Sequence, residues 1–134
     1  MSERIEPARW APPSGYANGM LASGRILAIA GQVGWDARQH LVSNDFLAQA
    51  EQAMRNISEV LRTAGGAPEN LVRMTWYVLD AAEYRAHAKA LGAAYRELFG
   101  SHYPAMTLIV VAGLLEAGAR IEIEATAVLP ALDE

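Results

Sequence analysis

Two carboxylates near the end of the chain, Glu122 and Glu124, have a spacing that points to chemistry. They alternate with apolar residues in segment 120–128, so an extended strand would present them on one face and the apolar residues on the other. A carboxylate in a partly apolar cleft can act as a general acid or base. The same carboxylates can instead form salt bridges, with Arg120 or with an arginine of a neighbouring subunit. Glu122 and Glu124 therefore need either positively charged partners or a ligand.

Other residue patterns that support catalysis or cofactor binding are missing from the sequence. The three histidines, His40, His87 and His102, lack the spacing of metal ligands, and the chain has no cysteine, which excludes thiol catalysis and thiolate metal sites. Segment 31–34 (Gly-Gln-Val-Gly) is too short for a nucleotide-binding fingerprint, and no phosphate loop or nucleophile elbow occurs. We expect neither a metal nor a cofactor.

Length and composition predict a single domain over residues 1–134, with residues 1–14 as an extended N-terminal segment. The chain is 52% hydrophobic, which is typical of a folded protein, and its net charge of −4 argues against a basic nucleic-acid-binding surface. Its first residues are charged and contain proline, unlike a signal peptide, and no apolar run is long enough to span a membrane. We expect a cytoplasmic protein with no nucleic-acid or membrane partner.

Apolar periodicity predicts strands and helices in the order β-β-α-β-α-β-β. The expected strands are 16–22, 25–30, 72–79, 106–112 and 120–128, the last two joined by a glycine-marked turn. One expected helix covers 46–64, capped by Ser43, Asn44 or Asp45; the second begins at Asp80, with Glu83 as a capping-box-like partner, and ends at Gly100. Within the first helix, Asn56 is either solvated or locally bonded, or a buried hydrogen-bonding post for a neighbouring loop.

This order predicts an α+β fold with a mixed sheet and two helices on one face. Two helices cover only one side of a sheet, yet segments 25–30, 72–79 and 106–112 carry apolar residues on both faces. An exposed apolar patch of several strands would exceed what soluble monomers usually tolerate. We therefore expect another subunit to cover the open face.

The chain resembles the Rid family, also called the YjgF or reactive-intermediate deaminase family, from about Ser14 to Val128. The matching residues occur in order and at matching spacing: Gly15-Tyr16, Ala30-Gly31-Gln32, 52–57 (Gln-Ala-Met-Arg-Asn-Ile), Tyr95 with Phe99, Tyr103-Pro104-Ala105, and 121–125 (Ile-Glu-Ile-Glu-Ala). The resemblance implies a chorismate-mutase-like fold and a homotrimer with ligand clefts between subunits. Many relatives hydrolyse enamines or imines to 2-keto acids and ammonia, whereas others bind small metabolites.

The resemblance also implies roles for individual residues. Glu122 matches a glutamate that positions or activates the hydrolytic water, and Tyr16 and Gly31 match substrate-binding positions. Tyr16 either contacts the ligand through its phenol or is an amphipathic residue at the rim of the cleft. Trp35 could form a lid or wall of the cleft, or anchor its loop. Met106 lines the pocket or fills the core. We expect Glu122 as the catalytic residue and the other four as substrate-binding residues.

Met106 is the main departure from the deaminase pattern. Deaminase relatives have Pro-Ala-Arg where this chain has Pro104-Ala105-Met106, and the arginine grips the substrate carboxylate. A thioether offers neither charge nor donor. Two further departures are Ala30, where relatives often have serine, and Gly92, commonly asparagine in deaminases. An arginine elsewhere (Arg9, Arg25 or Arg38) could replace the missing one.

Three functions follow from this pattern. The first is a hydrolase that acts on an enamine, an imine or a related labile metabolite, but not on the usual 2-imino acids. The alternative is a catalytically inactive trimer that binds or senses a small metabolite. A ribonuclease or translation inhibitor fits least, because the chain is acidic and lacks a basic, aromatic-rich pattern.

Overall fold

The computed structural model describes residues 2–132 and is built on one four-stranded sheet. Residues 1, 133 and 134 of the predicted domain lie outside the described residues. From one edge to the other, the strands are β3 (Arg25–Gln32), β6 (Ile121–Leu129), β4 (Leu71–Val78) and β5 (Ala105–Val110). β6 is antiparallel to both β3 and β4, whereas β5 is parallel to β4, so the sheet is mixed as predicted.

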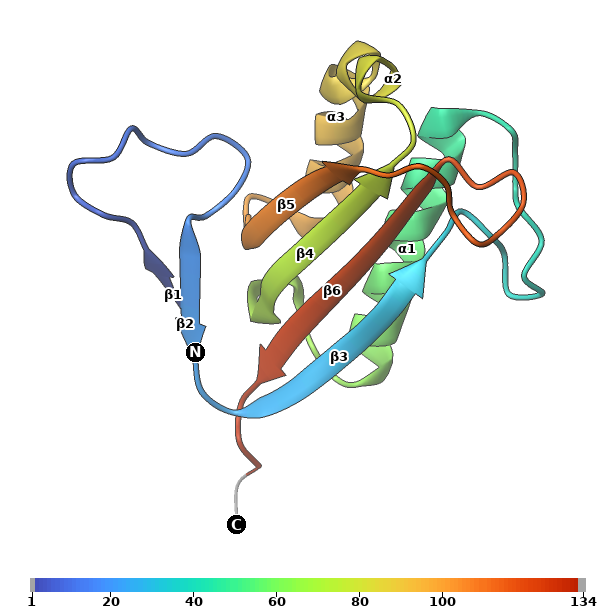
Figure 1. Cartoon of the computed structure of the whole chain (residues 1–134). Coiled ribbons are helices and arrows are strands. Elements are labelled where there is room, and N and C mark those ends of the chain that lie inside the picture. The colour runs from blue at the N-terminus through green and yellow to red at the C-terminus, as the bar shows by residue number, and fades with distance from the viewer. Residues whose placement is uncertain (1, 133–134) are drawn as a thin grey trace.

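The last two strands do not form a hairpin, in contrast to the predicted pair joined by a turn. β4 lies between β5 and β6, and residues 111–120 connect them past its end (Figure 1). A tight hairpin needs a short turn. This connection is long enough to cross one strand, and the crossing places β6 at the centre of the sheet.

The first helix follows the predicted pattern closely. α1 (Phe46–Thr63) begins after Asp45, whose carboxylate accepts a hydrogen bond from the Ala48 amide at 2.9 Å. This is the expected N-cap interaction. Gly65 follows the helix with a φ of 84°, a left-handed conformation that glycine adopts without strain.

The second predicted helix is divided in two. α2 (Ala81–Ala86) is capped by Asp80, and α3 (Ala88–Phe99) follows after His87, so the prediction of one continuous helix is wrong. Nδ1 of His87 lies 2.8 Å from the Glu83 carbonyl oxygen. The side chain thereby competes for a carbonyl that a continuing helix would pair with a backbone amide. The Glu83 side chain pairs with Arg120, away from the predicted capping box.

The N-terminal segment forms its own two-stranded sheet beside the main one (Figure 1). β1 (Ser2–Ile5) pairs antiparallel with β2 (Gly19–Ala22), which is shorter than the predicted strand 16–22. The Ala17 amide donates to the Pro104 carbonyl at 2.9 Å, and Ala17 forms a parallel bridge to Ala105. The segment is therefore attached to the edge strand β5.

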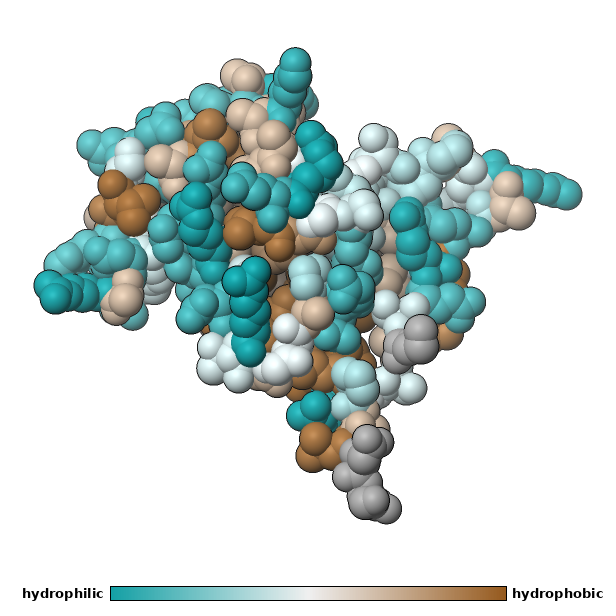
Figure 2. Space-filling view, turned by 180° about the vertical axis from the view of Figure 1, so that it is seen from behind, coloured by the Kyte–Doolittle hydropathy of each residue, from teal (hydrophilic) through white to brown (hydrophobic). Residues whose placement is uncertain are grey.

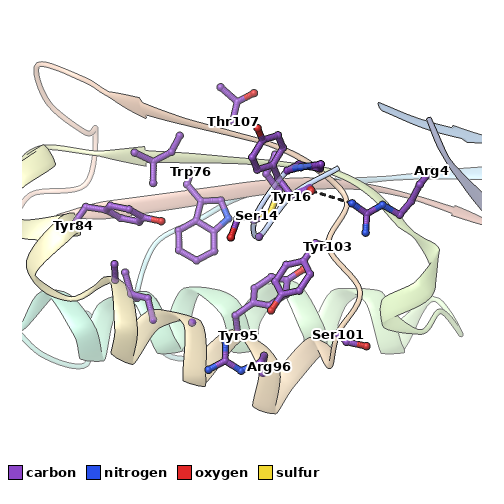
Figure 3. A pocket seen from close by; sticks show the side chains of 17 residues that line it. Arg4, Ser14, Tyr16, Trp76, Tyr84, Tyr95, Arg96, Ser101, Tyr103 and Thr107 are labelled. Carbon is purple, nitrogen blue, oxygen red and sulfur yellow. Dashed lines mark hydrogen bonds between the residues drawn. The ribbon is translucent and has the colours of Figure 1, made fainter. Parts of the chain in front are cut away.

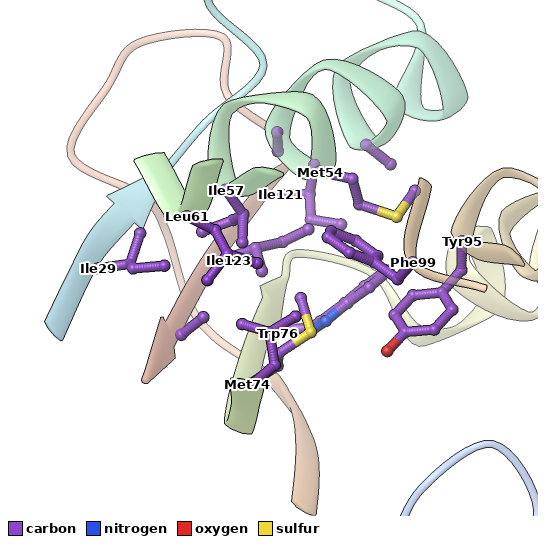
Figure 4. Close-up of a cluster of buried hydrophobic side chains, with 14 of the residues drawn as sticks. Ile29, Met54, Ile57, Leu61, Met74, Trp76, Tyr95, Phe99, Ile121 and Ile123 are labelled. Carbon is purple, nitrogen blue, oxygen red and sulfur yellow. The ribbon is translucent and has the colours of Figure 1, made fainter. Parts of the chain in front are cut away.

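The hydrophobic core lies between the sheet and the helices (Figure 4). β6 contributes alternate residues, and Ile121, Ile123 and Ala127 are fully buried. Hydrophilic side chains cover much of the helix side, with hydrophobic ones showing between them (Figure 2). The opposite face of the sheet is open, and it exposes apolar side chains such as Ile26, which is 76% exposed. No helix within residues 2–132 is long and apolar enough to cross a membrane.

Asn56 acts as the hydrogen-bonding post that one sequence interpretation proposed. Its Nδ2 donates to the carbonyl oxygens of Val33 at 3.2 Å and Trp35 at 2.9 Å. Gln52, one turn earlier, donates to the Asn56 Oδ1 and orients the amide. The loop after β3 is therefore held against α1 by one side chain.

Asn56→Ala should destabilise the protein by about 1–3 kcal/mol, because two loop carbonyls lose their donor. Glu59→Ala, on the exposed side of the same helix, should change stability by less than about 0.5 kcal/mol. Urea denaturation at one fixed protein concentration compares the two. Equal effects would show that the Asn56 contacts contribute nothing specific.

Candidate functional site

A pocket of about 890 Å³ lies between the edge strand β5, helix α3 and the N-terminal segment (Figure 3). Three elements therefore supply its walls. The sheet contributes Trp76, Met106 and Leu108; the helical side contributes Tyr84, Leu91, Gly92 and Arg96; the N-terminal segment contributes Arg4 and residues 13–16. A volume of this size is typical of pockets that enclose a small organic ligand.

Aromatic side chains dominate the interior of the pocket. Trp76, Tyr84 and Tyr103 project into it from different elements, and Tyr95 stacks on Tyr103 with ring centroids 5.0 Å apart. The Tyr95 hydroxyl donates to the His102 carbonyl at 2.7 Å. Burial raises the pKa of both Tyr84 and Tyr95 above the ordinary value of a phenol. These aromatic side chains thus give the pocket flat, uncharged surfaces.

Trp76 carries an unused hydrogen-bond donor in this wall. Its Nε1 is the one buried side-chain nitrogen or oxygen in residues 2–132 without a hydrogen-bond partner, and the residue is 5% exposed. Buried polar groups are nearly always paired, because an unpaired donor costs free energy. The nitrogen is enclosed by protein atoms, so a ligand would reach it only if the indole or its neighbours moved.

Two guanidinium groups border the pocket, and they differ in their partners. Arg4 pairs with the Glu6 carboxylate at 2.9 Å and donates to the Tyr16 carbonyl. Arg96 has no carboxylate within salt-bridge distance among the described residues. It lies one helical turn after Gly92, where an added Cβ would come 3.3 Å from the Arg96 Nη1. The missing side chain at position 92 leaves room for this guanidinium.

Two of the five predicted site residues line this pocket. Tyr16 reaches it from the N-terminal segment, and Met106 from β5. Gly31, Trp35 and Glu122 do not line it. Trp35 lies in the loop after β3, where it bridges to Leu41.

Gly31 and Glu122 form a second group on the open face of the sheet. The pairing of β3 with β6 is irregular between Ile29 and Gln32, and this bulge brings Gly31 under the Glu122 side chain. A Cβ at position 31 would collide with the Glu122 Oε2. Bulges often occur where a side chain must be redirected near a site.

The Glu122 carboxylate has no partner among residues 2–132. It is half-buried, and Arg120, which the sequence offered as a salt-bridge partner, pairs with Glu83. Glu124, two residues along, accepts a hydrogen bond from the Tyr77 hydroxyl at 3.0 Å in place of the expected salt bridge. That bond raises the pKa of Tyr77. Glu122 is therefore the carboxylate on this face that remains available.

One chain therefore holds two groups of candidate residues on opposite sides of the sheet. The pocket lies on the helix side of β5, and the Gly31 and Glu122 pair lies on the open face over β3 and β6. Within the described part of the chain, no cluster of three metal-ligating side chains occurs. The three arginines proposed as replacements do not border the pocket, and Arg25 instead donates to the Pro130 carbonyl at 3.0 Å.

The sequence pattern did not single out Arg96. Leu91 and Tyr95 of α3 belong to the hydrophobic core, and because α3 extends beside the edge strand they border the pocket as well. The spacing of Gly92 and Arg96, one turn apart on a helix, was the signal available for the guanidinium.

The fold, a mixed sheet with helices on one face, is that of the Rid structures. A model of the family described as Endoribonuclease L-PSP matches residues 7–129. The chain belongs to this family, which includes the YjgF and Rid proteins.

Relatives and solved structures agree with this assignment. The crystal structure of a Rid-family protein of unknown function from Yersinia pestis superposes with a TM-score of 0.83 at 40% identity, covering 96% of this chain and 98% of that one. The human 2-iminobutanoate/2-iminopropanoate deaminase is 34% identical over 84% of this chain and 79% of its own length. The protein of that name from Salmonella typhimurium is 31% identical over 78% of this chain and 80% of its length.

Alanine at Gly31 and at Gly34 should have different effects on stability. At Gly34 the new Cβ would lie 2.5 Å from Cα and 2.6 Å from the carbonyl oxygen of Gln49, which are backbone atoms of α1. We expect a loss of about 1–3 kcal/mol or more. At Gly31 the obstacle is the end of the flexible Glu122 side chain, which can rotate away, so the loss should stay below about 1 kcal/mol.

Thermal or urea denaturation of the two alanine variants tests this contrast. If Gly31→Ala is as destabilising as Gly34→Ala, the Glu122 carboxylate is held rigidly and is not an available side chain.

Proposed function

We propose that the chain is a Rid-type hydrolase that converts an imine or enamine into a carbonyl compound and ammonia. The observation that carries this proposal is the Glu122 carboxylate, which lies directly over the Gly31 backbone and has no partner within residues 2–132. A half-buried carboxylate without such a partner is suited to hold and activate a water molecule. The deaminase names of the human and Salmonella relatives support the same reaction class.

The reaction requires one water molecule and no cofactor. An enamine first tautomerises to its imine; water then adds to the imine carbon as Glu122 accepts a proton from the water. The imine nitrogen takes up that proton, which gives a carbinolamine. A second proton then moves from the new hydroxyl group to the nitrogen, the carbon–nitrogen bond breaks, and ammonia leaves as the carbonyl forms. Backbone amides near Gly31 stabilise the charge that develops during the addition.

We further propose a homotrimer with the cleft between neighbouring subunits. The open sheet face exposes Ile26 at 76% and the β5 side chain Ile109 at 40%, apolar surface that a neighbouring subunit would cover. The two groups of site residues lie apart within one chain. A cleft at the interface would combine the Gly31 and Glu122 pair of one subunit with the Tyr16 and Met106 wall of the next.

The substrate class follows from Met106, which occupies the pocket wall on β5. A thioether cannot clamp a carboxylate, and each charged hydrogen bond that is lost costs about 1.5–3 kcal/mol. We therefore propose that small 2-imino acids are poor substrates. Net charge also favours a small molecule over RNA, since the chain carries −4.

Glu122→Gln should lower the turnover of the chain's imine substrates by about 10²–10⁴-fold, because the amide cannot accept the proton from water. Ammonia release from freshly generated imines measures this, and size-exclusion chromatography checks that the assembly is unchanged. Glu124→Gln is the matched control, since its side-chain oxygen still accepts from Tyr77. Full activity in Glu122→Gln would contradict the proposed role.

Met106→Arg should increase kcat/KM for 2-iminobutanoate at least about tenfold over the wild type, because a guanidinium restores a two-pronged carboxylate donor. Met106→Lys, which adds charge without the planar fork, should gain less. A wild type that already hydrolyses 2-iminobutanoate efficiently would show that Met106 is no barrier. If the wild type and both variants are inactive on every imine offered, a binding or regulatory trimer replaces the enzyme as the better description.

A further inference from the structure

We infer that the pocket beside β5 binds an aromatic carboxylate, whose charged group Arg96 holds and whose ring lies between Trp76 and the tyrosines. This inference deepens the proposed function by naming its substrate class, and it rests on that function for the reaction itself. It relocates the carboxylate clamp from the strand, where Met106 stands, to helix α3.

Arg96 is the cation of this pocket that remains available for a ligand. Arg4 also borders the pocket, but Glu6 already neutralises it at 2.9 Å. No carboxylate within residues 2–132 pairs with Arg96, and its side chain is exposed at the α3 side of the pocket (Figure 3). A guanidinium presents two parallel donors that match the two oxygens of a carboxylate.

Gly92 is the reason that the guanidinium reaches the pocket. The two residues are four positions apart on α3 and share one face of the helix. A Cβ at position 92 would already come within 3.3 Å of the Arg96 Nη1, so a longer side chain there would displace the guanidinium. Gly92 therefore leaves the space in which the Arg96 guanidinium lies.

The second polar feature is the indole Nε1 of Trp76, which is buried and lacks a partner among the described residues. Trp76 itself lines the pocket from the opposite wall, on β4 (Figure 3), and this nitrogen is enclosed by protein atoms. A ligand whose binding turns the indole toward an acceptor would remove the free-energy cost of an unpaired buried donor.

The remaining wall selects a flat, apolar body. Trp76, Tyr84, Tyr103, Leu91 and Met106 supply the large apolar side chains in the lining of this pocket of about 890 Å³. A ring between aromatic side chains gains stacking contacts beyond its simple burial. A short aliphatic acid would leave most of these walls uncovered.

Isothermal titration calorimetry with two stable probes tests the inference without any turnover. The probes are 3-phenylpropanoate and its neutral isostere 3-phenylpropanamide. The wild type should bind the acid at least about tenfold more tightly than the amide, because the acid alone forms charge-assisted bonds with Arg96. Butanoate, which lacks the ring, should bind at least about tenfold more weakly than 3-phenylpropanoate.

Arg96→Gln should abolish the preference for the acid and leave the affinity for the amide within about threefold. Arg62→Gln, an exposed arginine on α1, is the matched control and should keep the preference. Circular dichroism confirms that each variant is folded. Three results would overturn the inference: no preference in the wild type, an unchanged preference in Arg96→Gln, or equal losses of acid and amide in that variant.

Glu122→Gln separates this inference from the proposed function. It should lose hydrolysis and still bind the acid at least about tenfold more tightly than the amide, because the Arg96 guanidinium is unchanged. If Glu122→Gln keeps full hydrolysis but Arg96→Gln loses the acid preference, the reaction proposal fails and the binding inference stands. If Glu122→Gln is inactive but Arg96→Gln binds normally, the reaction proposal stands and the clamp inference fails.

Discussion

The alternation of side chains along β6 is the constraint on which the rest of the structure depends. Ile121 and Ile123 are fully buried against the helices, and each contributes about 1.5–3 kcal/mol by its burial. A slip of one residue in the pairing of β6 would move these side chains to the open face and bury the carboxylates. The position of Glu122 is therefore determined by the core on the other side of the strand. One strand thus serves both stability and the proposed chemistry.

Polar side chains of α1 connect this core to the loops around the open face. Asn56 holds the loop after β3 by two of its carbonyls. Gln49 is fully buried; its Nε2 donates to the Ser43 and Gly118 carbonyls, and its Oε1 accepts from the Arg120 amide at 2.8 Å. Satisfied buried amides rigidify their surroundings because every alternative leaves a polar group unpaired. The loop after β3 and the start of β6 are thus positioned by one helix.

Periodicity was sufficient to predict the first helix and the inward face of β6, because these features depend on local patterns, and the order of the elements predicted the mixed sheet. It failed at His87, where a side chain competes for a backbone carbonyl, and for the expected hairpin, because strand order depends on contacts between distant segments. Tyr16 and Met106 line a pocket of the single chain, and their binding of substrate stays a prediction. Arg96 was missed because its importance comes from the empty space above Gly92, which no periodic pattern records.

The bridge from Ala17 to the start of β5 has a consequence for the exposed edge of the sheet. Edge strands carry unpaired backbone groups, which can pair with other chains and cause aggregation. The Ala17 amide occupies the Pro104 carbonyl, beside the first residue of β5, and the same contact brings residues 13–16 against the pocket. The N-terminal segment therefore covers one end of a strand edge whose unpaired backbone groups can pair with another chain. Detaching this segment would therefore expose the edge of β5 to pairing with other chains and would also remove residues 13–16 from the pocket wall.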